Sequence, residues 1–273
     1  MFQKMFENVR TKNPLIHNIT NYVTVNDCAN ITIACGAAPI MADDSEEVEE
    51  ITSLCAGLNI NIGTLNSRTI TAMLLAGKRA NEQNHPVVLD PVGAGASRLR
   101  TDTAMQLLEK VKFSVIRGNI SEIKTLASGS GTTKGVDAAV SDKVTKENLK
   151  EAVAFIKAFA GKTGAVIAVT GAIDIVTDGE KAYCIYNGHP MMSSISGTGS
   201  QLSAMTAAFV AANPDHPLEA AAAAVSAMGY AGEVAHSRLT GMDGNAAYRN
   251  YIMDAIYNMT PEMLEKGAKY EVR

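Results

Sequence analysis

The chain has 273 residues, of which 47% are hydrophobic, and its net charge at pH 7 is −4. This content is sufficient for a substantial core, and the scattered charges form no basic stripe, which argues against a nucleic-acid partner. No apolar run approaches the ~20 residues that span a membrane, and residues 1–14 are too polar for a signal peptide. We therefore expect a cytosolic protein with no membrane partner, folded as a single domain over residues 1–273.

The four cysteines, Cys28, Cys35, Cys55 and Cys184, are widely spaced along the chain. They form no Cys-x-x-Cys pair, and no histidines lie at zinc-finger spacing. In a reducing compartment we interpret them as small buried hydrophobic residues.

Strands and helices are predicted to alternate along the first two-thirds of the chain. Short apolar runs bounded by turn residues indicate strands, and apolar residues at helical spacing indicate helices. The predicted strands cover residues 14–19, 38–41, 58–63, 86–91, 113–116 and 165–170. The predicted helices cover 24–35, a segment capped at Ser45, 66–81, 103–110, a segment from 121, and 146–159. This alternation predicts an α/β fold with a mainly parallel sheet flanked by helices on both faces.

The pattern changes after residue 170. Residues 174–179 and 181–186 predict two strands joined by an Asp-Gly-Glu turn, a β-hairpin at one edge of the sheet. Three helices are predicted to complete the domain, at 199–212, 217–237 and 245–258. The stretch 129–143 is rich in Gly, Ser and Thr and is the best candidate for a mobile loop.

Polar residues and glycines follow nearly every predicted strand. In an open parallel sheet, ligands bind beyond the carboxyl ends of the strands. We therefore expect the residues at these ends to meet and form an active site. They are Asn18–Asn21, Met41, Gly63-Thr64, Asp90, Arg117-Gly118-Asn119 and Thr170-Gly171.

The segment 193–209 joins the turn Gly197-Thr198-Gly199 to a helix of small and apolar residues. Glycine permits a positive φ and a close approach to a ligand. The helix directs its free N–H groups and its positive dipole end back at the turn. The turn is therefore predicted to bind an anion, with the Ser200 hydroxyl at its lip.

Two other glycine segments match phosphate-binding motifs only in part. Gly161-Lys162-Thr163 ends like a P-loop, but Ile156 stands where the first glycine belongs, and the segment leads from a helix to a strand. We interpret it as a helix C-terminus followed by a short loop. Gly93-Ala-Gly95 follows a strand, but Arg98 stands at the third glycine position, which disfavours a hydride-transfer enzyme.

Asp90 ends a very apolar strand, and Glu122 lies one turn into the helix after the next strand. Two carboxylates at adjacent strand ends suit Mg²⁺, held mostly through waters beside nucleotide phosphates. The alternatives are a loop cap for Asp90 and a helix-start acid for Glu122. Arg117 is either an ion-pair partner or a phosphate clamp. No histidine, including His17 near the rim, is placed in a triad with Ser200 by the sequence.

Taken together, these motifs resemble those of the 5-(2-hydroxyethyl)-4-methylthiazole kinases of the ribokinase-like superfamily. The resemblance covers nearly the whole chain, and its most specific parts are AAPIM at 37–41, RGNISEI at 117–123 and VTGAIDIVTDG at 169–179. It implies a ribokinase-like fold and phosphorylation of the thiazole's hydroxyethyl group by ATP with Mg²⁺ in thiamine salvage. It also implies a homotrimer with active sites at the subunit interfaces.

The resemblance also implies roles for ten residues. It places Met41, Gly197 and Asn21 at the thiazole, Arg117 and Thr170 at ATP, Asp90 and Glu122 at magnesium, and Thr198, Gly199 and Ser200 at the point of transfer. The sequence departs from the family at Ser200, where sugar kinases of this superfamily carry an aspartate base and thiazole kinases typically a cysteine. Because serine is a poor base, we expect a slow kinase in which Ser200 orients the alcohol and the proton leaves late.

Two other functions stay open at this point. Related ribokinase-like proteins phosphorylate the pyrimidine precursor of thiamine or dehydrate damaged nicotinamide nucleotides, and a substrate panel distinguishes these activities. The apolar wall Pro39-Ile40-Met41 favours a thiazole. A protein that binds both ligands without turnover is the third possibility, which the two carboxylates and Arg117 argue against.

Overall fold

In the computed structural model, which describes residues 1–129 and 143–273, a nine-stranded sheet organises the chain. The strands lie in the order β2-β1-β3-β4-β5-β6-β7-β8-β9. Strands β1 to β6 are mutually parallel, and β7, β8 and β9 are antiparallel to their neighbours. The bounds are β1 (Leu15–Ile19), β2 (Ala38–Ile40), β3 (Gly57–Asn61), β4 (Val87–Asp90), β5 (Val115–Asn119), β6 (Val166–Thr170), β7 (Asp174–Thr177), β8 (Ala182–Ile185) and β9 (Tyr270–Val272).

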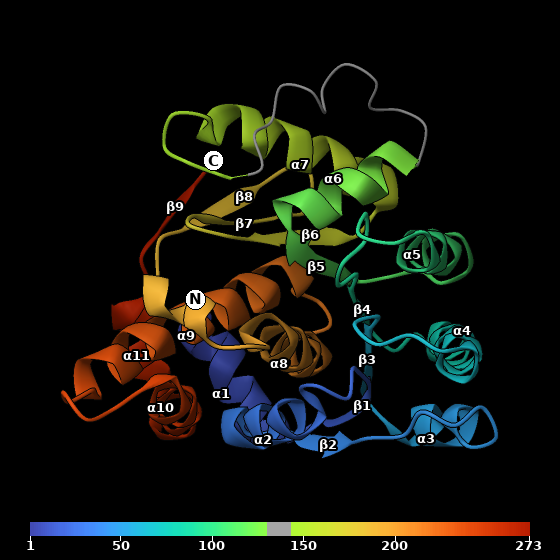
Figure 1. Cartoon of the computed structure of the whole chain (residues 1–273), viewed down its shortest axis with the longest axis horizontal. Helices are drawn as coiled ribbons and strands as arrows, with labels where there is room; N and C mark the ends of the chain where they lie inside the picture. Colours follow the sequence, from blue (N-terminus) through green and yellow to red (C-terminus); the bar gives the residue numbers. More distant parts are fainter. Residues whose placement is uncertain (130–142) are drawn as a thin grey trace.

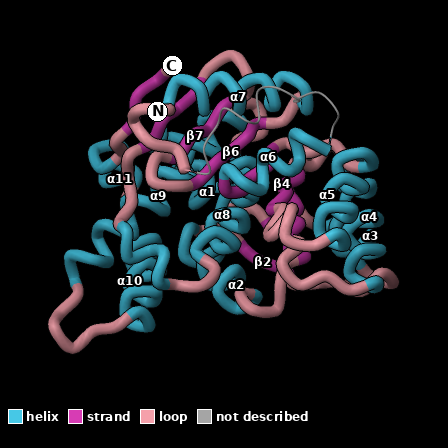
Figure 2. Tube along the Cα trace, turned by 45° about the horizontal axis from the view of Figure 1, so that its top comes forward, coloured by secondary structure: helices cyan, strands magenta, loops and turns pink. Residues whose placement is uncertain are grey.

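Helices cover both faces of this sheet (Figure 1). One face carries α3 (Val48–Leu54), α4 (Ser67–Glu82), α5 (Arg98–Lys110), α6 (Ile120–Gly129) and α7 (Leu149–Thr163). The other carries α1 (Phe2–Lys12), α2 (Val25–Cys35), α8 (Thr198–Ala212), α9 (Pro217–Arg238), α10 (Asn245–Asn258) and α11 (Pro261–Gly267). Figure 2 shows the same layers from a second direction, with the strands enclosed between the helices. The predicted α/β class and the mainly parallel sheet are confirmed.

Two apolar cores, one on each face, hold the layers together. Successive strand residues point to opposite faces, so Val88 packs with α8 and α9, whereas its neighbour Leu89 packs with the opposite helices. Helix α8 is buried on nearly every side. It therefore occupies a fixed position against the carboxyl halves of the central strands.

Four elements were not predicted: helices α1 and α11, the 3-10 helix η1 (Pro190–Ser194) and strand β9. Strand β9 pairs antiparallel with β8, so the predicted hairpin is followed by one more strand and β9 forms that edge of the sheet. Three residues carry too little alternation to be recognised as a strand. Helix α1 packs on α9 and α11 through its buried face, which includes Phe2 and Phe6.

Helix starts differ from prediction where capping was misjudged. Helix α3 begins at Val48, and Asp44 rather than Ser45 accepts a nearby backbone N–H, that of Glu46. Helix α5 begins at Arg98 because the Ser97 side chain caps it.

The segment Gly161–Thr163 forms the last turn of α7, and Gly164, with φ 70°, ends that helix. The stretch expected as a loop at 129–143 falls almost entirely outside the described residues. All four cysteines are buried and free, as predicted. Within the described residues, no helix combines the length and apolarity needed to cross a bilayer.

Candidate functional site

The carboxyl ends of β3, β4 and β5 converge on the first turn of α8. Val88 and Val115 pack in the core beneath α8, so Asp90 and Arg117, two residues later on the same strands, face the same way. Asn61 stands opposite Asp90 in the register of β3 and β4. The fold thus directs a carboxylate, a guanidinium and an amide at the N-terminus of α8.

Asp90 is fully buried and lies at the centre of this arrangement. Its Oδ2 accepts hydrogen bonds from Asn61 Nδ2 at 2.7 Å and from Ser203 Oγ at 2.9 Å. Its Oδ1 lies 3.5 Å from Arg117 Nη1 and has no hydrogen-bond partner among the described residues. Burial, reinforced by the charge of Glu122, raises the pKa of Asp90 to about 6, although Arg117, Ser203 and Asn61 act in the opposite direction.

The Arg117 guanidinium packs against the start of α8. A Cβ at Gly199 would lie 2.5 Å from Arg117 Nη1, so only glycine leaves room for the guanidinium there. Nη2 donates to Thr170 Oγ1 at 2.5 Å, and Nε is buried without a recorded partner in the described residues. A cation beside the positive end of a helix is a favourable place for an anion with several oxygens.

The turn that leads into α8 has the conformation expected of it. Gly197 adopts φ 88°, and a Cβ there would collide with the Thr24 side chain. Helix α8 has neither a side-chain cap nor an acidic residue in its first turn. Within the described residues, no cap therefore occupies its first N–H groups, which leaves them available to a ligand.

Ser200 is 7% exposed and lies in the first turn of α8. Its Oγ accepts hydrogen bonds from Asn21 Nδ2 at 3.1 Å and from Asn61 Nδ2 at 3.0 Å. No carboxylate or imidazole is hydrogen-bonded to this oxygen in the described residues. His17, expected near the rim, is buried, with Nδ1 2.9 Å from Thr52 Oγ1 and Nε2 2.8 Å from the Ala42 carbonyl.

Glu122 bridges two loops at the same edge. One carboxylate oxygen accepts the Gly93 N–H and the other the Asn119 N–H, each at 2.8 Å. Asn119 Oδ1 in turn accepts the Glu122 N–H at 2.9 Å, a reciprocal cap for α6. The helix-start role considered for Glu122 is therefore present, and each oxygen keeps a second lone pair.

Asp90 and Glu122 provide carboxylate oxygens, the kind of ligand that Mg²⁺ prefers. This ion keeps several waters and binds through one or two carboxylates. Asp90 offers Oδ1, which has no hydrogen-bond partner among the described residues, and the charge of Glu122 adds to the effect of burial in raising the pKa of Asp90. No group of three or more His, Cys, Asp or Glu suited to a metal occurs in the described residues. The residues present therefore fit a hydrated Mg²⁺ rather than a metal enclosed by protein.

The structure links most of the predicted site residues but not all of them. Hydrogen bonds, ion pairs or close packing connect Asn21, Asp90, Arg117, Thr170, Gly199 and Ser200. Glu122 acts on this group through its charge, which contributes to the raised pKa of Asp90. Met41 stands apart, half-buried after β2 at the end of the sheet, where it packs on the α8-side core.

Three participants were missed in the sequence: Asn61, Ser203 and Asp174. Asn61 was assigned to the interior of a strand at 58–63, whereas β3 ends at Asn61 itself. A polar residue at the end of an alternating apolar run was the available signal. Asp174 accepts the Gly171 N–H at 2.8 Å and orients the turn after Thr170, and burial raises its pKa to about 7.

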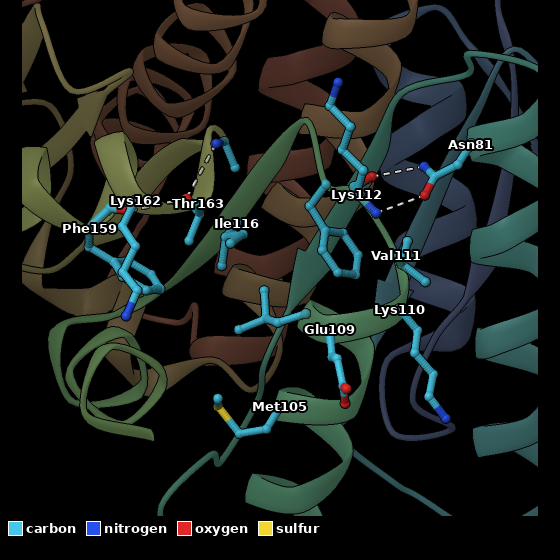
Figure 3. Close-up of a pocket in the computed structure, with 13 residues that line it drawn as sticks. Asn81, Met105, Glu109, Lys110, Val111, Lys112, Ile116, Phe159, Lys162 and Thr163 are labelled. Atoms are coloured by element: carbon cyan, nitrogen blue, oxygen red, sulfur yellow. Dashed lines mark hydrogen bonds between the residues drawn. The ribbon is translucent and has the colours of Figure 1, made fainter. Parts of the chain in front are cut away.

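A separate pocket of about 600 Å³ opens at the amino ends of the strands. Figure 3 shows it between the last turns of α5 and α7, with Lys110, Lys112 and Lys162 around it. Its floor includes Phe113, Ile116 and Phe159, and none of the predicted site residues lines it. It therefore has no part in the arrangement around Asp90.

The raised pKa of Asp90 predicts how stability varies with pH. Because the folded chain keeps this proton up to about pH 6 and the unfolded chain loses it near 3.8, the folded state binds more protons between those values. The free energy of unfolding should therefore fall as pH rises, with Asp90 contributing up to about 1.4 kcal/mol per pH unit. Urea titrations of Asp90→Asn should show a shallower fall, and an unchanged pH profile would contradict this assignment.

The comparisons with known proteins agree on one family. Residues 6–262 match the model of the hydroxyethylthiazole kinase family. A hydroxyethylthiazole kinase from Clostridium acetobutylicum is 64% identical over 271 residues, covering 99% of each chain. The structure of the hydroxyethylthiazole kinase protein from Pyrococcus horikoshii OT3 has a TM-score of 0.88 at 34% identity, over 100% of this chain and 98% of that one.

A more distant structure bears on the fold alone. A ribokinase-like superfamily protein from Enterococcus faecalis V583 aligns with a TM-score of 0.61 at 12% identity, over 98% of this chain and 90% of that one. The ribokinase-like architecture expected from the sequence is confirmed. The match over residues 6–262 and the 64% identity together show that the chain belongs to the hydroxyethylthiazole kinase family.

Proposed function

We propose that this protein transfers the γ-phosphoryl group of ATP to the hydroxyl of hydroxyethylthiazole, a step of thiamine salvage. The alcohol oxygen bonds to the γ-phosphorus, the bond from that phosphorus to the bridging oxygen of ADP breaks, and the alcohol proton is released. One observation carries the proposal: the Arg117 guanidinium and the uncapped N-terminus of α8 meet over Gly199, beside the buried carboxylate of Asp90. Positioned positive groups of this kind stabilise the charge that develops on a transferring phosphoryl group.

The roles of the other residues follow from where they stand. Arg117 and Thr170, joined side chain to side chain, bind the nucleotide phosphates. Asn21, Gly197 and Met41 bind the thiazole, and Thr198 and Gly199 present backbone N–H groups to the phosphoryl group in flight. Asp90 and Glu122 hold Mg²⁺, which when bound neutralises phosphate charge and aligns the phosphates.

Ser200 takes the place of a general base without being one. Within the described residues, two amide groups donate to its Oγ and no proton acceptor is hydrogen-bonded to it, so we propose that the chemistry depends on positioning and electrostatics. A positioned base is typically worth roughly 10²–10⁴-fold in rate. We therefore propose a slow kinase in which the alcohol proton passes to phosphate oxygen or water.

The direct test is a phosphorylation assay on hydroxyethylthiazole with fresh protein and ATP. Product should form with Mg²⁺ and fall to the buffer blank when the metal is chelated, because the phosphates then lose their counter-charge. A panel with the pyrimidine precursor of thiamine and with a hydrated nicotinamide nucleotide serves as control. No thiazole phosphate, or faster turnover of a panel compound, would refute the proposal.

Ser200→Asp tests the account of position 200. The new carboxylate would face the two amide donors and could accept the alcohol proton, so kcat should rise about tenfold or more. Ser200→Ala, which offers neither a donor nor a base, is the matched control and should be slower than the natural chain. An aspartate variant that binds both ligands normally yet is no faster would show that proton acceptance does not limit the rate.

We also propose a homotrimer with active sites between subunits. Large apolar side chains are exposed directly beside Asn21: Tyr22 is 78% exposed and Val23 61%, and Ile33 of the adjoining α2 is 54% exposed. Such patches on a functional edge are typical of protein interfaces. Light scattering should give three times the 28.8 kDa of one chain. Tyr22→Ser/Val23→Ser should lower both the mass and the activity, and a monomeric natural chain would refute this arrangement.

A further inference from the structure

We propose that Asn61 and Asn21 fix the hydroxyl of Ser200 as a hydrogen-bond donor, and that Asn61 is the positioning residue that couples Ser200 to Asp90. The Ser200 hydrogen is then directed at the oxygen of the substrate alcohol. This inference rests on the proposed function for its substrate. The direction of the hydrogen bonds at Ser200, by contrast, follows from the contacts alone.

The amide of Asn21 has one permitted orientation. Its Oδ1 accepts the backbone N–H of Thr24 at 3.1 Å and the Thr24 hydroxyl at 3.0 Å. A backbone N–H can only donate, so the oxygen must lie on that side. The Nδ2 group therefore faces Asn61 Oδ1 and Ser200 Oγ, both at 3.1 Å, and each of its hydrogens has an acceptor.

The amide of Asn61 is fixed in the same way. Its Oδ1 accepts the Gly63 N–H at 2.9 Å in addition to Asn21 Nδ2. Its Nδ2 donates to Asp90 Oδ2 at 2.7 Å and to Ser200 Oγ at 3.0 Å. Flipping this amide would place its oxygen against the Asp90 carboxylate and its hydrogens against the Gly63 N–H. The amides of Asn21 and Asn61 therefore each have one orientation, in which Nδ2 donates to Ser200 Oγ.

The Ser200 hydroxyl can act toward the substrate only as a hydrogen-bond donor. A hydroxyl has two lone pairs and one hydrogen. The two amide N–H groups occupy both lone pairs, and in the described residues no acceptor is recorded for the hydrogen. Ser200 therefore offers the substrate oxygen a donor and cannot accept the hydrogen bond of the alcohol. The alcohol's own hydrogen must point elsewhere, toward the oxygens of the phosphate.

Asn61 links Ser200 to Asp90 because its Nδ2 donates a hydrogen bond to each of them. Ser203 is its counterpart on Asp90, since it donates to the same Oδ2, and within the described residues no hydrogen bond joins it to Ser200. Replacing Asn61 removes a donor from both groups, and replacing Ser203 removes a donor from Asp90 alone. This difference provides a matched control.

The first test needs no catalysis. In Ser200→Cys the two amides would face a sulfur, and N–H donors together with a helix N-terminus stabilise a thiolate. The pKa of the introduced thiol, followed by thiolate absorbance, should lie below the ordinary value of about 8.5. The natural cysteines do not interfere, because burial raises the pKa of Cys28 and Cys55 to about 11, that of Cys35 to about 12, and that of Cys184 as well.

Adding Asn61→Ala to Ser200→Cys should raise that thiol pKa by about one to two units, which corresponds to the loss of one hydrogen bond to a charged group. Adding Ser203→Ala should leave it unchanged. The charged groups near position 200, Asp90 and Arg117, are kept in both double variants. No shift with Asn61→Ala, or an equal shift with Ser203→Ala, would overturn the proposal. If Asn61→Ala fails to fold, Asn21→Ala removes the other donor and must produce the same rise.

The second test uses turnover. Asn61→Ala should lower kcat about tenfold in the natural chain and much less in a Ser200→Ala background, whereas the effect of Ser203→Ala should be the same in both. Equal effects of Asn61→Ala in the two backgrounds would contradict the coupling. A natural chain that does not phosphorylate the thiazole would refute the proposed function, and the thiol titration would still decide this inference.

Discussion

The burial of one carboxylate, that of Asp90, is the constraint on which the carboxyl edge of the sheet depends. A buried charge is unfavourable unless it is paired and hydrogen-bonded. Arg117, Asn61 and Ser203 supply these partners from β5, β3 and α8, and so fix where these elements meet. Compensation is incomplete, because Oδ1 has no hydrogen-bond partner among the described residues and the pKa is raised. A bound cation would complete it.

Polar groups without a hydrogen-bond partner in the described residues occur at this edge of the sheet. In the described part of the chain, Asp90 Oδ1 and Arg117 Nε have no hydrogen-bond partner, and the N-terminus of α8 has no side-chain cap. Buried polar groups in folded proteins are normally satisfied, and this supports the proposal that a ligand binds here. Gly199 allows the Arg117 guanidinium to lie against the start of α8, since any side chain there would displace the guanidinium.

The sequence predicted the sheet and its helical layers, because strand ends and periodicity are local signals. It also predicted which strand ends the structure brings together at the start of α8. It failed where the outcome depends on tertiary contacts. Strand β9 is recognisable only once β8 is present to pair with it. Asn61 was overlooked because a two-residue error in the end of β3 placed it inside the strand. The direction of its amide, which decides what Ser200 can do, depends on the Gly63 N–H and on Asn21.

The central claim is that phosphoryl transfer occurs at the first turn of α8, with Ser200 as donor to the alcohol. A crystal structure with a non-hydrolysable ATP analogue, Mg²⁺ and hydroxyethylthiazole tests it most directly. The account predicts the terminal phosphate against Arg117 and the N–H groups at Thr198 and Gly199, and the alcohol oxygen within hydrogen-bond distance of Ser200 Oγ. A nucleotide bound away from Arg117, or an alcohol oxygen out of reach of Ser200, would contradict it.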